Sequence, residues 1–298
     1  MNSINPLLRE VDERTLYLMG LGDWQAFHAA NMKVESVFEA AARWSSALQG
    51  VDRPWLVWNA HDDWCLVQQR LVEAAGWTPV VGFDPRVGAP PVTAKAIPVN
   101  FNETLRLPFM APHFVLEFLF LFADRLAFWH SDLLIPIAKM RELAARFDAL
   151  KPGEVMATSL FRPLRFWRKP RRYWELVGCS TREASRDQFE RGAGWWSYIH
   201  AHVNCRASAE RERREKKVYW DHGAGIKYWH DEYGGKVIGI PVDSVDRGHF
   251  SPVTYPNLYK RLPEGNRNRN LRSQLDATVG VVAACDKMGI SYADLMRD

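Results

Sequence analysis

Short apolar runs alternate with amphipathic stretches through the first half of the chain. Residues 34–48 repeat apolar positions with helical spacing, and residues 55–60 (WLVWNA) form a short apolar run after Pro54. The pattern predicts an amphipathic helix over residues 61–77 and a second strand over residues 78–83. Together these segments form a β-α-β unit of about the usual 30 residues.

The same alternation continues to residue 161. The pattern predicts a helix over residues 113–125, a strand over 126–130, a strongly periodic helix over 137–150 and a strand over 154–161. These strands are apolar on both faces, which is typical of parallel strands covered by helices. The sequence therefore predicts an α/β fold with a mostly parallel sheet flanked by helices.

The pattern is weaker after residue 161. Residues 181–205 read as a turn and helices, one strand is predicted over residues 236–242 (KVIGIPV), and a helix is predicted over residues 273–289. Neither a linker nor an internal repeat divides the chain. We therefore expect residues 1–298 to form a single domain with a C-terminal elaboration of loops and a helix.

The composition is that of a globular protein. Hydrophobic residues make up 47% of the 298 positions and charged residues 25%, which excludes wholesale disorder, collagen-like and coiled-coil architectures. The four cysteines form no Cys-x-x-Cys pair, so neither a disulfide framework nor a structural zinc site is expected, and a reducing cytoplasm fits best. The N-terminus is acidic where a signal peptide is basic, and charged residues interrupt the apolar segment 112–129, so no membrane span is expected.

Positive charge is concentrated in three tracts although the net charge is only +4. The tracts cover residues 162–172, 206–217 and 260–272, and aromatic residues are interleaved in the first of them. Such tracts suit an anionic partner, such as nucleotide phosphates, an acidic glycan, a membrane surface or nucleic acid. A solvated helix face or loop explains each tract equally well.

Polar residues follow three of the predicted strands. Asn59, Asp62 and Asp63 follow the first strand, Asp84 follows the second, and His130-Ser131-Asp132 follows the strand over residues 126–130. Ligands of open α/β sheets bind beyond the carboxyl ends of the strands, so we expect these residues to share a site. Each alone is also compatible with a turn or a helix cap. Mn²⁺ or Mg²⁺ suits such carboxylates, and Mn²⁺ also tolerates imidazole.

In the order of its elements the chain resembles the GT-A fold of nucleotide-sugar glycosyltransferases. In that family a β-α-β nucleotide-binding unit precedes a strand that ends in an Asp-x-Asp motif, and the resemblance covers roughly Pro54 to Trp196. It implies that residues 54–160 bind the nucleotide sugar and that residues 161–298 form the acceptor side. Asp132 would bind the metal that neutralises the donor diphosphate, with His130 in place of the first Asp.

The resemblance extends to the segment 178–196 (GCSTREASRDQFERGAGWW). It is similar to an acceptor-side segment in which a small-residue strand leads to an arginine and then to a turn of glycines and an aromatic residue. On this interpretation Trp195 and Trp196 form a stacking platform for a sugar ring. Two buried tryptophans at the end of a helix are the alternative.

The segment YWDHGAGIKYWHDEYGG supplies further candidates. The family often uses a late histidine as an additional metal ligand, and His222 and His230 are the candidates for that role. If the reaction inverts the configuration, a carboxylate must deprotonate the acceptor. Asp221, Asp231 and Glu232 are then the candidate bases.

The sequence thus predicts a glycosyltransferase that moves a sugar from a nucleotide-diphosphate donor to a hydroxyl acceptor with the help of a divalent cation. The acceptor is a glycan, a small molecule or a modified nucleic acid. Two alternatives stay open: a nucleic-acid-binding or nucleic-acid-modifying protein, including one that glycosylates a DNA base, and a metal-dependent phosphoesterase. Many of the thirteen tryptophans lie near the predicted cleft in sequence, although a core beneath it would use the same positions.

Overall fold

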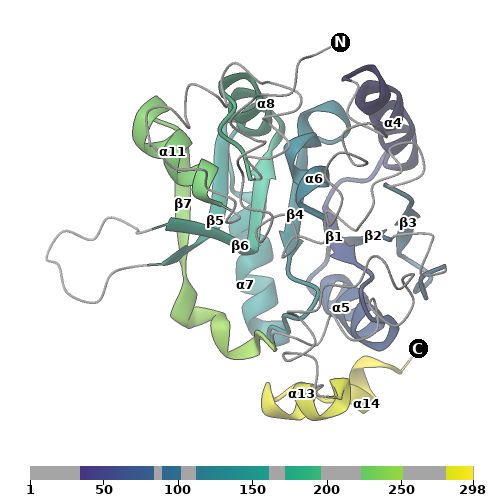
Figure 1. Ribbon diagram of the computed structural model, residues 1–298. Coiled ribbons are helices and arrows are strands. Elements are labelled where there is room, and N and C mark those ends of the chain that lie inside the picture. The colour runs from purple at the N-terminus through teal and green to yellow at the C-terminus, as the bar shows by residue number, and fades with distance from the viewer. Residues whose placement is uncertain are drawn as a thin grey trace, which may run out of the picture.

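The computed structural model describes residues 34–83, 89–101, 112–160, 172–195, 223–250 and 280–297 (Figure 1). Seven strands of these residues form one sheet in the order β3-β2-β1-β4-β6-β5-β7. Their bounds are β1 (Pro54–Trp58), β2 (Thr78–Gly82), β3 (Ile97–Val99), β4 (Arg125–Trp129), β5 (Glu154–Leu160), β6 (Arg172–Thr181) and β7 (Lys236–Pro241). Strand β4 lies in the middle of the sheet, between β1 and β6 (Figure 1).

One strand of the sheet runs against the others. The pairs β2–β3, β1–β2, β1–β4 and β5–β7 are parallel, whereas β6 pairs antiparallel with both β4 and β5. All five residues of β1 are buried, as expected for a strand covered on both faces. The predicted α/β fold with a mostly parallel sheet is confirmed at this level.

Helices cover both faces of the sheet. The eight α-helices of the described residues are α4 (Val34–Ala47), α5 (Asp62–Ala74), α6 (Pro112–Glu117), α7 (Ile137–Asp148), α8 (Arg182–Arg191), α11 (Ala224–Tyr233), α13 (Val281–Lys287) and α14 (Tyr292–Leu295). Buried residues of α4, α6, α8 and α11 form one core layer, and those of α5, α7 and α13 form another. The sheet therefore separates two hydrophobic cores.

Strand β1 contributes to both cores because successive side chains of a strand point to opposite faces. Leu56 and Trp58 belong to the core under α4 and α8, and Trp55 belongs to the core under α5 and α7. The Trp55 ring contacts those of Trp77, Trp129 and Phe147 at centroid distances of 5.2 to 5.6 Å. These tryptophans are therefore core residues rather than an exposed sugar-binding surface.

The structure differs from the predicted elements in several places, among them the helix α11, which the pattern did not predict. The helix predicted over residues 113–125 is the short α6 followed by a 3-10 turn, η2 (Leu119–Leu121). The pattern also missed β3 and most of the ten-residue β6, whose buried Glu175 interrupts its apolar run. Of the helix predicted over residues 273–289, the described part is α13. Within the described ranges, no helix combines the length and hydrophobicity needed to cross a bilayer.

Candidate metal centre

The turn His130-Ser131-Asp132 follows β4 directly and is held by a buried glutamine. The backbone N–H of Leu133 donates to the carbonyl oxygen of His130 (3.2 Å), which closes the turn. Gln68 of α5 is fully buried, and its Nε2 donates to the carbonyl oxygens of His130 and Leu133, both at 2.8 Å. Helix α5 therefore fixes the backbone that carries His130 and Asp132.

A second segment reaches this turn from beyond β7. The N–H of Leu134 donates to the carbonyl oxygen of Gly248 (2.9 Å), and the N–H of Phe250 donates to that of Asp132 (2.9 Å). Leu133 and His249 form an antiparallel bridge between these hydrogen bonds. The pairing places His249 beside His130, although the two are 119 residues apart in the sequence.

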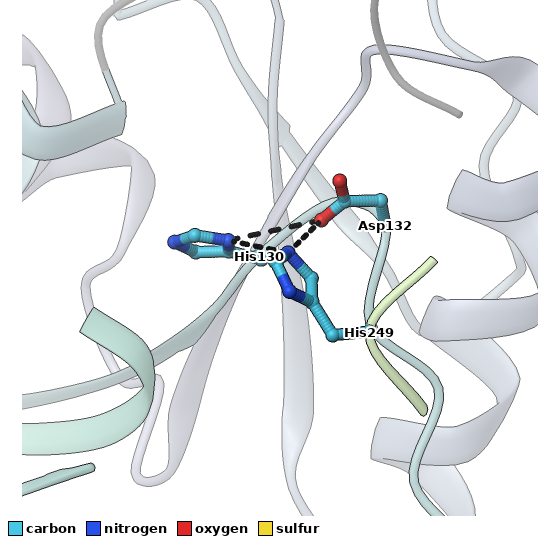
Figure 2. A group of neighbouring side chains, drawn as sticks. All are labelled: His130, Asp132 and His249. Atoms are coloured by element: carbon cyan, nitrogen blue, oxygen red, sulfur yellow. Dashed lines mark hydrogen bonds and ion pairs between the residues drawn. The ribbon is translucent and has the colours of Figure 1, made fainter. Parts of the chain in front are cut away.

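Figure 2 shows that His130, Asp132 and His249 point toward one another. His249 Nε2 lies 3.3 Å from both Asp132 Oδ1 and His130 Nδ1, and His130 Nδ1 lies 3.7 Å from Asp132 Oδ1. An ion with bonds of about 2.1 Å holds neighbouring ligand atoms about 3.0 to 3.4 Å apart. The partly buried group could therefore hold one metal ion after small side-chain movements, and three ligands leave coordination positions for a substrate.

The electrostatics of the group suit a cation. Burial opposes the ionised form of Asp132, but the hydrogen bond from His249 and the positive charges of both histidines hold its pKa below the ordinary value. Burial opposes the charged form of His130, but the hydrogen bond and negative charge of Glu175, together with the charge of Asp132, raise its pKa. The carboxylates of Asp132 and Glu175 thus lie against the two histidines, and a metal ion bound at the same place would interact favourably with their negative charge.

The aromatic ring of Trp174 lies beside the rings of His130 and His249. Its centroid lies 5.4 Å from that of His130 and 5.2 Å from that of His249, edge-on in both cases. Trp174 is half-buried on β6. Trp174 therefore packs against both imidazoles of the candidate centre.

The residues predicted after β1 lie at the same edge of the sheet. The parallel register pairs Leu56 with Phe128, so the ends of β1 and β4 are level. Asn59 is buried, and its Nδ2 donates to Asp62 Oδ1 (3.1 Å). Asp62 and Asp63 lie in the first turn of α5. These residues lie at the same edge of the sheet as the centre but do not belong to the ligand group found among the described residues.

The candidates on α11 lie elsewhere. His230 Nδ1 donates to the carbonyl oxygen of Gly235 (2.7 Å), which satisfies a backbone group at the end of the helix. Asp231 pairs with Lys227 one helical turn away, and Glu232 is exposed. His230 is not part of the ligand group. Among the described residues, the late histidine of the centre is therefore His249.

Trp195 is a core residue in the structure. It is 1% exposed, and its ring meets that of Phe128 edge-on with centroids 4.8 Å apart. A sugar ring has no open face of Trp195 on which to stack. Asp84, Trp196, Asp221 and His222 lie outside the described residues, as do nearly all residues of the three basic tracts.

Sequence reasoning missed three residues of the centre. His249 lies in a short loop after β7, where no pattern links it to β4. Gln68 occupies an amphipathic helix as an ordinary polar position, and Glu175 lies in a strand that was not predicted. The only signal for His249 was the expectation of a late histidine, which pointed to His222 and His230.

Comparisons with protein-family models, curated proteins and solved structures found no match. The function must therefore be argued from the site itself.

Gly248 offers a direct test of how His249 is positioned. A Cβ at residue 248 would overlap the carbonyl oxygen of Leu134, so Gly248→Ala must push the His249 segment away from the turn. We expect the free energy of unfolding to fall by about 1–3 kcal/mol. Mn²⁺ affinity, measured by titration of the metal-free protein, should fall about 10-fold or more.

The matched control is Gly280→Ala. A Cβ at residue 280 meets no atom within 4 Å, and φ there is −59°, which alanine adopts freely. This variant should bind Mn²⁺ as the wild type does. Equal affinities for the wild type and Gly248→Ala would contradict the assignment of His249 as a ligand.

Proposed function

We propose that this protein is a metal-dependent glycosyltransferase that moves a sugar from a nucleotide-diphosphate donor to a hydroxyl acceptor. The observation that carries the proposal is the group formed by His130, Asp132 and His249 at the carboxyl end of the central strand β4. Ligands of open α/β sheets bind at this edge. A cation held there would face a diphosphate bound beyond the strands.

The strand order supports the resemblance to the GT-A fold. The β1-α5-β2 unit precedes β4, which lies beside β1 and carries the motif at its end. Strands β3, β2, β1 and β4 form a parallel block, and the reversed β6 follows β4 in the sheet. The late histidine that the resemblance implies has a counterpart in His249.

In this proposal the protein side chains hold and orient the donor. His130, Asp132 and His249 would hold the cation, which would supply positive charge for the phosphate groups of the donor. When bound, the cation stabilises the negative charge that the diphosphate gains as the glycosidic bond breaks. In this proposal Asn59, Asp62 and Asp63, which follow β1, contact the nucleoside part of the donor.

The ligand set favours Mn²⁺ over Mg²⁺. Two of the three ligand atoms are imidazole nitrogens, which transition metals accept readily and Mg²⁺ binds poorly. A divalent manganese ion also binds the oxygens of Asp132 and of a diphosphate. We therefore propose Mn²⁺ as the activating ion.

The residue that would deprotonate the acceptor hydroxyl is not assigned. Asp231 and Glu232 are exposed on α11, which packs over the core layer opposite to that of α5 and α7. Their position does not favour either as a base at the β4 edge. A retaining transfer requires no enzyme base, and Asp221 stays a candidate for an inverting one.

The proposal is tested by measuring the thermal unfolding of the full chain with nucleotide diphosphates and nucleotide sugars, each with and without Mn²⁺. A ligand at about 100 times its Kd adds about 2.7 kcal/mol of stability, so the donor should raise the midpoint measurably and only with Mn²⁺. No shift with any nucleotide sugar would contradict a transferase. Release of phosphate without an acceptor would instead support a phosphoesterase, and salt-dependent binding to DNA would support a nucleic-acid partner.

The donor set favours one second candidate. Two histidines and one carboxylate with open positions are also the ligands of non-haem Fe(II) oxygenases. That function would be preferred if Fe²⁺ binds much more tightly than Mn²⁺ and no nucleotide stabilises the protein. The location of the group at the carboxyl edge of an α/β sheet favours the transferase.

A further inference from the structure

His130 has a second partner that does not belong to the ligand group. Its Nδ1 faces Asp132 and His249, whereas its Nε2 lies 3.1 Å from Glu175 Oε1. Glu175 is 3% exposed and lies on β6, the strand next to β4. The imidazole is therefore held between a buried carboxylate on one side and the candidate ion position on the other.

A bulge in β6 brings Glu175 to this position. The register of β5 and β6 pairs Ala157 with Gly178 but Thr158 with Trp174, so three residues of β6 have no partner on β5. These residues turn toward β4, where the N–H of His130 donates to the carbonyl oxygen of Leu176 (3.0 Å). Bulges of this kind redirect side chains beside functional sites.

The buried side chain of Thr158 stabilises the bulge. Its hydroxyl donates to the carbonyl oxygen of Val177 (3.0 Å) and accepts from the N–H of the same residue (3.2 Å). Both backbone groups are thereby satisfied although the strands part at this point. The distortion of β6 is thus a stable feature with its own hydrogen bonds.

We propose that Glu175 is a positioning residue of the metal centre, which accepts the Nε2–H of His130 and so makes Nδ1 the nitrogen that binds the ion. The inference rests on the proposed metal site. When the Glu175 carboxylate is ionised it can only accept a hydrogen bond, so in the neutral imidazole Nε2 carries the proton and Nδ1 keeps its lone pair. Such a partner fixes the tautomer and orientation of a ligand histidine.

The test is titration of metal-free protein with Mn²⁺, comparing the wild type with Glu175→Gln. The glutamine keeps the size of the side chain, but its amide can donate to Nε2 and so favour the wrong tautomer. We expect Mn²⁺ affinity to fall about 10- to 100-fold. The control is Glu117→Gln, which changes another buried glutamate, in α6, and should leave the affinity unchanged.

A second measurement needs no variant at Glu175. Long-range ¹H–¹⁵N spectra of metal-free protein with ¹⁵N-labelled histidine, at alkaline pH, report which ring nitrogen carries the proton. The signals of His130 are identified by their loss in His130→Gln. The Nε2–H tautomer is expected in the wild type, and the Nδ1–H tautomer would overturn the proposal.

The outcomes separate this inference from the transferase proposal. Equal Mn²⁺ affinities for the wild type and Glu175→Gln, or an equal loss in Glu117→Gln, overturn the role of Glu175 and leave the transferase untouched. If Glu175→Gln binds Mn²⁺ more weakly than the wild type but no nucleotide sugar binds the wild type, the role of Glu175 is supported and the transferase proposal is contradicted. Failure of the wild type to bind Mn²⁺ overturns both.

Discussion

Replacing Asp132 by alanine is expected to abolish the proposed Mn²⁺ binding and to reduce the proposed sugar transfer by on the order of 1,000-fold or more, because a bound cation contributes several kcal/mol to stabilising the transition state. Asp132 supplies the only carboxylate of the ligand group. Without it two imidazoles remain, with no negative charge to hold a divalent ion. Mn²⁺ titration and initial rates with the donor identified by thermal unfolding measure both effects.

The fold should survive this change. The backbone of the turn is held by Gln68 and by the hydrogen bond from Phe250 to the carbonyl oxygen of Asp132, neither of which involves the carboxylate. Asp243→Ala is the matched control, since it removes an exposed carboxylate from the 3-10 turn η3 (Val242–Ser244) that follows β7. Retained activity in Asp132→Ala, or an equal loss in the control, would contradict the metal assignment.

The largest effect on stability is expected for Trp55→Ala. Trp55 is fully buried, and its ring packs against Trp77, Trp129 and Phe147. Truncation would leave a cavity that the surrounding strands and helices cannot close. We expect the free energy of unfolding to fall by about 3–5 kcal/mol, a large share of the total stability of a protein.

Urea unfolding monitored by circular dichroism measures this loss. The comparison variant is Val282→Ala on α13, where the side chain is 49% exposed and the change should stay within about 0.5 kcal/mol. A loss below about 1 kcal/mol for Trp55→Ala would show that Trp55 is not packed as described. It would restore the interpretation of the tryptophans as a ligand-binding surface.

The first half of the fold could be predicted from the sequence because its elements are formed by local patterns. The strands ending at Trp58 and Trp129 are apolar on both faces, and the helix α5 between them has regular amphipathic spacing. Strand β6 was missed because Glu175 is buried through a contact with His130, which no local pattern reveals. A polar residue in an apolar strand becomes understandable only once its distant partner is known.

The candidate site was predictable to the same extent. His130 and Asp132 follow a buried strand, so the position of a site at the end of β4 could be read from the sequence. His249 could not, because it is brought there by the backbone pairing of residues 248–250 with the turn after β4, which no local pattern reveals. The sequence around His230 made it an equal candidate for the late metal ligand. In the structure its Nδ1 instead donates to the carbonyl oxygen of Gly235, just after α11.

The antiparallel pairing of the His249 segment with the turn after β4 has a consequence for biosynthesis. A ribosome releases His130 and Asp132 long before His249, so a nascent chain that ends before β7 has only two ligands and holds an ion weakly. The third ligand, His249, follows β7, which pairs with β5 in the sheet. Tight binding requires all three ligands. A bound ion would therefore stabilise chains in which β7 and the His249 segment have joined the fold relative to chains in which they have not.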